Sequence, residues 1–183
     1  SGMTEVRSGS LMLCVDMYEA SPGEECENRE PKSTLESTRN LAQAECVPDS
    51  KPQAQPWRFI SLNQAQAACA SVGKRIPTSE EWYVLALGTQ PDSCVLDTGG
   101  PARTGSPECV SSSGVHDSVG NVWEWTNETV TNGQFLNRTL PKSGYVASVD
   151  QHGVAITTDS SEQEMYADDY FWGKTDGTFG MIR

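Results

Sequence analysis

Two short helices with clear start and stop signals constrain the fold of this chain more than any other feature. In ISLNQAQAACASVGKR, Ser61 is placed as an N-cap, Gln64 completes a capping box and Gly73 marks the end of the helix. In RIPTSEEWYVLALGT, Thr78 and Glu81 repeat the box, and another glycine ends the helix. Both segments are therefore expected to be packed helices without a chemical role.

Short strands and polar loops are expected on either side of these helices. The stretch SLMLCVDMYEAS opens with alternating apolar and polar residues, which predicts a strand. Strand-like runs recur late in the chain, in GYVASVD, GVAITT, DYFWG and FGMIR. Helices followed by short strands and long loops indicate the α+β class.

The expected organisation is a single domain over residues 4–183. Residues 1–3 resemble a cloning scar ahead of a start methionine and are not expected to belong to the domain. Polar insertions are expected at residues 22–56, with one short helix around Leu35 to Cys46, and at residues 94–109. Hydrophobic residues make up 36% of the chain, which predicts a small core beneath these loops.

The six cysteines stand singly, without any C-x-x-C spacing, which favours disulfides over a zinc site. Two pairs bracket polar excursions of the chain, and the remaining two cysteines lie on an expected strand and an expected helix. The predicted bridges are Cys26–Cys46, Cys94–Cys109 and Cys14–Cys69. Reduced, buried cysteines are the alternative. Disulfides favour an extracellular or cell-surface protein, or an intracellular protein of a hyperthermophile.

The formal net charge is −12, from 25 acidic and 13 basic residues. Such a surface repels phosphate groups, so nucleic acid is not expected as a partner. The same charge would tolerate a hard cation such as calcium. No stretch approaches the roughly 18 apolar residues of a membrane helix, so membrane insertion is not expected.

The segments GKRIPTSEEW and HDSVGNVWEWT, in this order, resemble the domain of the formylglycine-generating enzymes, the sulfatase-modifying-factor family. The resemblance covers roughly Cys14 to Thr126 and implies a C-type lectin-like fold, with two helices and a small twisted antiparallel sheet. The stretches CVDMYEAS, PWRFISLNQAQAAC and LPKSGYVASVD further resemble variable proteins of diversity-generating retroelements from archaea and uncultivated bacteria. In those proteins this fold presents a hypervariable ligand-binding face.

The residues that carry catalysis in the family are not found in this chain. The enzymes bind copper(I) through two cysteines near the C-terminus, and a soft thiolate pair suits that ion. Here no cysteine follows Cys109, so copper is not expected. Related iron-dependent sulfoxide synthases take histidine ligands from another domain, and this chain has only His116 and His152. The resemblance therefore implies a non-catalytic ligand-binding protein.

The last residues leave two alignments with the family open. FGMIR resembles either the strand that precedes the family's catalytic tail or the family's terminal strand. The first alignment is preferred, and it implies that the domain lacks its final C-terminal segment. The alternative function is then a formylglycine-generating or related oxidase whose catalytic tail is absent from this chain.

The block HDSVGNVWEW also resembles a calcium-binding turn of the family. Carried over, the ligands are Asp117, the carbonyls of Gly120 and Val122, and Glu124. Calcium takes about six to eight oxygen ligands, and a Gly-Asn turn lets carbonyls converge. A turn held by Asn121 without a metal is the alternative.

The two tryptophans of this block alternate with an acid. Strand alternation places Trp123 and Trp125 on one face and Glu124 on the other. Both indoles are therefore expected in the core, against the helix that begins after Thr78.

The stretch MYADDYFWGKTDGT is expected to supply a ligand-binding face. Its aromatic residues offer rigid contact area, and its charged residues add specificity. The candidate residues are Tyr166, Asp168, Asp169, Tyr170, Trp172, Lys174 and Asp176. Phe171 is expected in the core, and the alternatives are a core Trp172 and solvated acids. The expected partner is a protein or cell-surface molecule, with a purely structural surface or phage-tail protein as a further hypothesis.

Overall fold

The computed structural model describes residues 2–96, 99–166 and 169–183, and its described part contains three α-helices and several short strands. The helices are α1 (Thr34–Leu41), α2 (Leu62–Ser71) and α3 (Ser79–Ala86), with 3₁₀ turns η1 (Pro91–Ser93) and η2 (Glu164–Tyr166). The strands are β1 (Met3–Ser8), β2 (Leu11–Asp16), β3 (Ala20–Pro22), β4 (Pro48–Ser50), β5 (Trp125–Thr131), β6 (Gln134–Phe135), β7 (Arg138–Thr139), β8 (Gly144–Val149), β9 (Ala155–Asp159), β10 (Tyr170–Phe171) and β11 (Thr178–Ile182). The predicted α+β class is confirmed.

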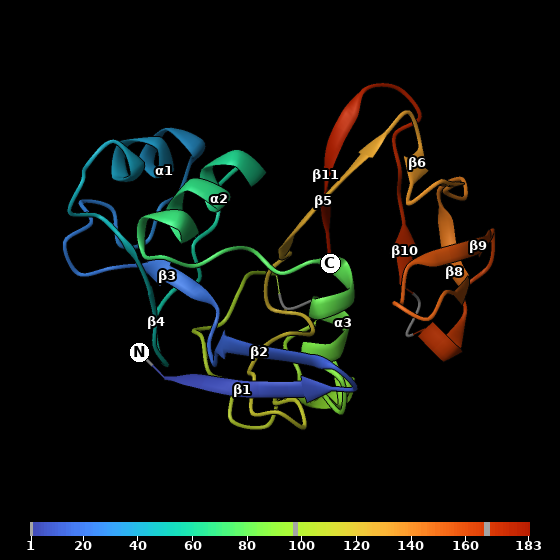
Figure 1. Cartoon of the computed structure of the whole chain (residues 1–183), viewed down its shortest axis with the longest axis horizontal. Coiled ribbons are helices and arrows are strands. Elements are labelled where there is room, and N and C mark those ends of the chain that lie inside the picture. Colours follow the sequence, from blue (N-terminus) through green and yellow to red (C-terminus); the bar gives the residue numbers. More distant parts are fainter. Residues whose placement is uncertain (1, 97–98, 167–168) are drawn as a thin grey trace.

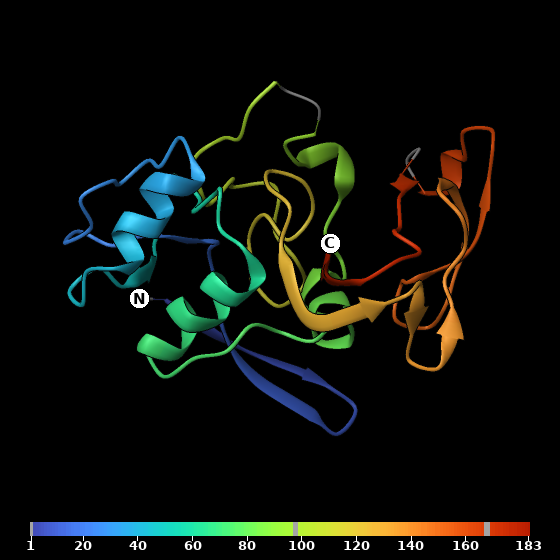
Figure 2. The ribbon, with the colours of Figure 1, turned by 90° about the horizontal axis from the view of Figure 1, so that it is seen from above.

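The strands form small antiparallel sheets. Two are pairs, β1 with β2 and β3 with β4, and the others have the orders β11-β5-β6-β7 and β10-β8-β9. In Figure 1 the two-stranded sheets β1-β2 and β3-β4 lie together with the helices, and we call this part the body. Strands β8, β9 and β10 lie at the end far from α1, and we call this part the lobe. The view from above shows the same separation, with β5 and β11 leading from the body towards the lobe (Figure 2).

The start signals of α2 and α3 operate as predicted. The Ser61 hydroxyl accepts from the Gln64 N–H, and the Gln64 side chain accepts from the Ser61 N–H at 2.9 Å. Thr78 and Glu81 form the same reciprocal pair at α3. Gly73 follows α2 with a φ of 70°, the left-handed conformation that glycine adopts without a steric cost. None of the helices in the described residues is long and apolar enough to cross a membrane.

The hydrophobic core is divided into small clusters, as the low hydrophobic content predicts. Val6, Leu85 and Val115 join β1, α3 and the loop before residue 116. A second cluster surrounds Trp57 and the Cys26–Cys46 pair. The third, which lies around β5, β6 and β11, consists of Val130, Phe135, Val154 and Met181.

The first residues take part in the fold, although the sequence suggested that they are a scar. Met3 begins β1 and pairs with Asp16, and the Gly2 carbonyl accepts from the Met17 N–H at 3.1 Å. The partner strand, β2, alternates as predicted, since Leu13 and Val15 pack on the core while Cys14 is exposed.

Two of the three predicted disulfides are formed. Cys26 bonds Cys46, with their Cα atoms 4.4 Å apart, and Cys94 bonds Cys109, with a Cα separation of 4.7 Å. The predicted Cys14–Cys69 bridge is wrong for this structure, in which both cysteines are free. Cys14 of β2 and Cys69 of α2 both line one cleft.

Candidate functional site

A cleft with a volume of about 1350 Å³ lies in the body, between β2 and α2. Four consecutive residues of β2, 13–16, line it; since neighbouring strand residues point to opposite faces, the cleft follows the edge of β2. Ala65 and Ala68 of α2 and residues 121–125 contribute other parts of the lining. Ligand pockets span about 300–1,000 Å³, so this cleft is large enough for a small organic molecule.

The GKRIPTSEEW segment builds one wall of the cleft through ion pairs. Lys74 Nζ donates to Asp16 of β2 at 2.7 Å. Arg75 donates to both carboxylate oxygens of Glu81 at 2.6 Å, and the same carboxylate accepts from the Thr78 N–H at 2.8 Å. The Arg75 guanidinium holds the pKa of Glu81 below its usual range. These charged residues therefore fix α3 and the wall.

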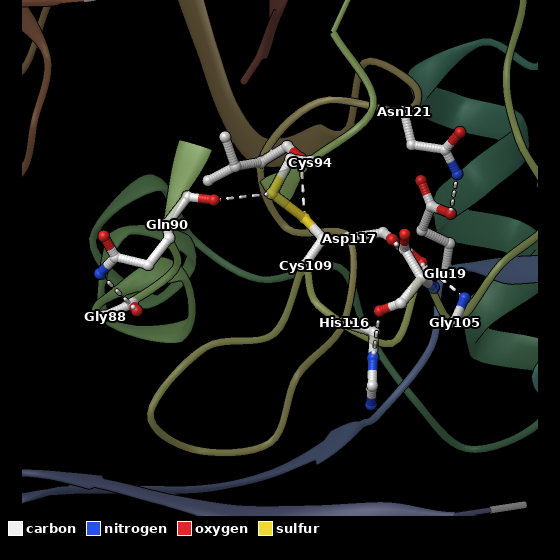
Figure 3. The surroundings of a disulfide bond; sticks show 11 residues. Glu19, Gly88, Gln90, Cys94, Gly105, Cys109, His116, Asp117 and Asn121 are labelled. Carbon is white, nitrogen blue, oxygen red and sulfur yellow. Dashed lines mark hydrogen bonds between the residues drawn. A yellow bond between two sulfur atoms is a disulfide. The ribbon is translucent and has the colours of Figure 1, made fainter. Parts of the chain in front are cut away.

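Three carboxyl groups interact electrostatically at the cleft: Glu19 and Glu124, which line it, and Asp117. Glu19, which is 7% exposed, accepts from the Asn121 side chain at 2.6 Å, and its other oxygen has no hydrogen-bond partner among the described residues. Asp117, which is 1% exposed, accepts from the backbone N–H groups of residues 105 and 106 at 2.6 and 3.3 Å. Glu124 accepts from the indole N–H of Trp82. Figure 3 shows Glu19, Asp117 and Asn121 near the Cys94–Cys109 disulfide.

Burial and mutual repulsion favour the neutral forms of these acids. Burial, followed by repulsion from Glu124, raises the pKa of Glu19 to about 9. Burial raises the pKa of Glu124 to about 7, and the neighbouring Asp117 adds to this effect. Burial also raises the pKa of Asp117, although the two backbone N–H groups oppose that change. The cluster therefore holds protons near neutral pH, which is unusual for carboxyl groups.

The backbone between residues 116 and 124 has an unusual conformation. Asp117, Gly120 and Asn121 have positive φ values of 58°, 77° and 57°. A Cβ atom on Gly120 would lie 2.5 Å from the Val95 carbonyl oxygen, so only glycine fits there. The Asp117 N–H donates to the Cys109 carbonyl at 3.0 Å, which ties the turn to the disulfide. The Gly-Asn pair thus serves close packing against residues 94–96.

The predicted calcium ligands lie on this turn but already have other partners. The Asp117 carboxylate accepts backbone N–H groups, and Glu124 accepts the Trp82 indole. Within residues 2–96, 99–166 and 169–183, no group of three or more His, Cys, Asp or Glu side chains is placed to share a metal ion. A calcium ion would rely on the carbonyls of Gly120 and Val122, and the site stays a prediction.

The two tryptophans of the block do not share a face. Trp123 is 60% exposed, whereas Trp125 is half-buried and donates its indole N–H to the Ile60 carbonyl at 2.9 Å. Strand β5 begins only at Trp125, so the alternation that was expected does not extend back to Trp123. The acid Glu124, not an indole of this block, contacts Trp82 of α3. The prediction that both indoles pack in the core is wrong for Trp123.

A second candidate site lies where the lobe meets the body. The rings of Trp123 and Trp172 are 4.8 Å apart between centroids, with their planes at 81°. Tyr170, which is 49% exposed, packs against Tyr145 with centroids 5.1 Å apart and planes at 88°. We call these four residues the aromatic surface. Trp172 is 49% exposed, so of the two positions left open by the sequence it has the one outside the core.

The other predicted ligand residues differ in exposure. Tyr166 is half-buried in η2, whereas Asp169, Lys174 and Asp176 are exposed. Lys174 covers the Phe179 ring at 4.8 Å from its centroid. Asp168 lies outside the described residues. The structure thus places Tyr170 and Trp172 in ring pairs. Asp169, Lys174 and Asp176 are exposed and lie outside these pairs.

Sequence reasoning missed several residues of both sites. Glu19 carried no signal, because its burial depends on contacts with a turn about 100 residues later. Phe59 lines the cleft and is exposed, with a φ of 58° that is rare for an aromatic residue. Trp123 was misplaced because it precedes β5, so strand alternation does not apply to it.

Comparison with known proteins connects the chain to two kinds of relatives. It is 30% identical over 133 residues to the inactive C-alpha-formylglycine-generating enzyme 2 of Bos taurus, covering 56% of this chain and 44% of that protein. The Mus musculus counterpart is 29% identical over the same length, covering 56% of this chain and 42% of that protein. Hercynine oxygenase of Mycolicibacterium smegmatis is 23% identical over 151 residues, covering 72% of this chain and 30% of that protein.

These similarities support a relationship with the formylglycine-generating enzymes. The chain spans less than half the length of each of these relatives. No protein-family model matches it, and no solved structure matches it significantly. The expectation that the chain is not an enzyme is contradicted by the similarity to hercynine oxygenase, which points towards an oxidase. The other two relatives carry the name of an inactive enzyme.

Proposed function

We propose that this chain is a ligand-recognition domain with a C-type lectin-like fold, whose ligand contacts the aromatic surface. The observation that carries the proposal is the pair Trp123–Trp172, whose large indole rings remain 60% and 49% exposed. Clustered exposed aromatic rings mark binding sites more often than ordinary surface does. They bury a large area on contact and have few rotatable bonds to order.

The proposed ligand is a protein or cell-surface molecule, because three of the four rings of the aromatic surface, those of Tyr145, Tyr170 and Trp172, lie outside the cleft and are at least partly exposed to solvent. Interfaces with proteins are enriched in Trp and Tyr at their energetic centres. The disulfides Cys26–Cys46 and Cys94–Cys109 support an oxidising environment, in which extracellular ligands are met.

A variable protein of a diversity-generating retroelement is the specific form of this proposal. It is supported by the resemblances noted above and by the origin of Tyr170 and Trp172 late in the chain. The neighbouring DNA provides the test. We expect an adjacent reverse transcriptase gene and a near-copy of the 3′ end of this gene that differs at adenines; a genome without either would contradict this form.

Alanine substitution tests the proposal itself. Trp172→Ala and Tyr170→Ala should weaken binding to the cognate ligand about 100-fold, as expected for centres of an interface, with unchanged circular dichroism. Ile156→Ala is the matched control, since Ile156 is 47% exposed in the same lobe but is outside the aromatic surface. Equal loss of stability and binding in the tyrosine and tryptophan variants would place these residues in the core instead.

A second candidate function, oxidation of a small molecule in the cleft, is favoured by the similarity to hercynine oxygenase. Because the described residues lack a group of three metal-ligating side chains, a metal centre would draw ligands from elsewhere. Oxygen uptake with hercynine, measured with and without added iron(II) or copper(I), tests this function. Uptake that depends on hercynine would support it, and none with either metal would remove it.

We also propose a calcium site at Asp117, Gly120, Val122 and Glu124. Support comes from the repulsion between the two carboxyl groups, which a cation would relieve. Calorimetric titration with calcium after chelation should release or absorb heat and raise the melting temperature, because the ion binds only the folded state. No heat and an unchanged melting temperature would exclude the site.

A further inference from the structure

The aromatic surface contains a corner formed by two exposed indoles. Trp123 comes from the segment just before β5, and Trp172 follows β10 in the lobe. Their planes meet at 81° with centroids 4.8 Å apart, and both rings keep about half or more of their surface in solvent. Two nearly perpendicular ring faces can contact a single rounded group at the same time. We call this pair the indole corner.

Other aromatic rings of the chain already carry a cation of their own. Arg58 lies 5.3 Å from the Phe59 centroid, Lys174 lies 4.8 Å from that of Phe179, and Arg183 lies 5.2 Å from that of Trp82. Within the described residues, no lysine or arginine covers either ring of the indole corner. Indole binds cations on its face more strongly than the other aromatic side chains. Trp123 and Trp172 are therefore exposed indoles whose faces are not covered by a side-chain cation in the described residues.

The net charge of the chain favours a cationic ligand. The whole chain carries a formal net charge of −12, and residues 144–183 contribute seven acidic but only two basic side chains. Such a surface attracts cations over roughly one Debye length and repels carboxylate or phosphate ligands. The protein thus combines two exposed indole faces with a strongly negative net charge.

We propose that the indole corner binds a quaternary or other methylated ammonium group, carried by the ligand of the aromatic surface. This inference rests on the proposed recognition function and names the chemical class of its ligand. A methylated ammonium group suits the corner better than a free ammonium group, because the latter is compact and strongly hydrated. The methyl groups bury apolar area against both indoles while the positive charge is attracted to their faces.

Titration of the ¹⁵N-labelled protein with choline tests the inference directly. The chain has five tryptophans, so five indole N–H signals are available, and substitution assigns those of Trp123 and Trp172. We expect these two signals to shift with choline and with tetramethylammonium. The neutral isostere 3,3-dimethylbutan-1-ol should bind about tenfold more weakly, since it lacks the charge. Added salt should weaken choline binding only.

Variants separate the indole corner from the rest of the surface. Trp172→Leu and Trp123→Leu should each weaken choline binding about five- to tenfold, whereas Trp172→Phe should restore part of it because a ring is kept. Phe179→Leu is the matched control, since Phe179 is an exposed ring that Lys174 already covers. Unchanged backbone amide spectra would show that each variant is folded.

Each outcome decides between the two proposals. Equal binding of choline and its neutral isostere would overturn the cation inference and leave ligand recognition by the aromatic surface standing. Choline binding that survives in both leucine variants would place the cation elsewhere and also overturn it. If choline shifts neither signal, the inference fails, and the effect of Trp172→Ala on the cognate ligand then decides the proposed function independently.

Discussion

Glu19, Asp117 and Glu124 bring three carboxyl groups into the interior of a chain that is already strongly acidic. Isolated buried charges are costly, so burial favours protonation of such groups. Hydrogen bonds from Asn121 and Trp82 offset only part of this effect. At the scale of single residues, proton binding therefore couples the turn of residues 116–124 to the stability of the fold.

The first prediction concerns pH. Because the pKa of Glu19 is about 9 in the folded chain and near 4.5 when unfolded, the folded state binds more protons between these values. This contribution to stability is present at low pH and is lost as the pH rises towards 9. The melting temperature, measured in EDTA, should fall over this range, and fall less in Glu19→Gln.

The exposed Glu25 provides the control for this experiment. Glu25→Gln removes one carboxyl group from the surface and should keep the pH profile of the unmodified chain. A Glu19→Gln profile that runs parallel to both would mean that Glu19 is not the group that binds the proton.

The second prediction concerns Gly120. Alanine there would have to keep a φ of 77° and place Cβ 2.5 Å from a carbonyl oxygen. We expect Gly120→Ala to lower the free energy of unfolding by about 3 kcal/mol. Gly9→Ala, at a φ of 59° with no atom within 4 Å, should lower it by only about 1 kcal/mol. Equal effects in urea denaturation would show that the contact with Val95 is relieved without cost.

At the scale of elements, α3 is held by side chains from its own start and from β5. Thr78 and Glu81 close its capping box, and Arg75 anchors Glu81. Glu128 of β5 adds a carboxylate, whose two oxygens both lie 2.9 Å from the Ser79 N–H. Negative charge stabilises the positive end of a helix, so this contact joins α3 to the sheet.

The third prediction removes the contact between β5 and α3. Glu128→Ala should lower the free energy of unfolding by about 1 kcal/mol, because the first turn of α3 loses an acceptor and a favourable charge. Glu162→Ala removes an exposed acid without such a contact and should have little effect. Chemical denaturation of both variants measures the difference, and equal stabilities would show that water replaces Glu128 at no cost.

At the scale of the whole molecule, small core clusters are supplemented by disulfides. Within the described residues, the clusters around Val6, Trp57 and Val130 are separate, and the last of them joins Val154 of the lobe to β5 and β11. The bridges close loops of 20 and 15 residues and restrict the unfolded chain. Each is expected to contribute about 3 kcal/mol in the chain-entropy model.

The fourth prediction counts thiols. The folded, oxidised chain should present two reactive thiols, an exposed Cys14 that reacts quickly and a half-buried Cys69 that reacts slowly. Burial raises the pKa of the Cys69 thiol, which lowers its thiolate fraction. Full reduction should expose six thiols and lower the melting temperature. Finding no free thiol in the oxidised chain would restore the Cys14–Cys69 bridge.

Much of the local structure could be predicted because its causes are local. The starts of α2 and α3 depend on Ser61 and Thr78 and on residues within one turn of them. The alternation in β2 depends on neighbouring residues, and the Cys94–Cys109 loop is short in sequence. Each of these contacts joins positions that the chain holds close in any conformation.

Contacts between distant residues could not be predicted in the same way. The hydrogen bond from Asn121 to Glu19 spans 102 positions, and nothing in the sequence near Glu19 indicates it. The exposure of Trp123 depends on where β5 begins and on the approach of Trp172 from the lobe. Whether Cys14 and Cys69 form a bridge depends on how β2 and α2 pack, and these elements are far apart in the sequence.

The amino-acid pattern alone was enough for the α+β class, the helix boundaries near Gly73 and Gly88, and two of the disulfides. Only tertiary packing brought three carboxyl groups near one another, opened a cleft beside β2 and set two indoles at right angles in solvent. The physical reason is the distance along the chain over which each interaction acts. Capping and alternation act within about one turn or a few strand residues, whereas burial and charge repulsion depend on which distant segments the fold brings together.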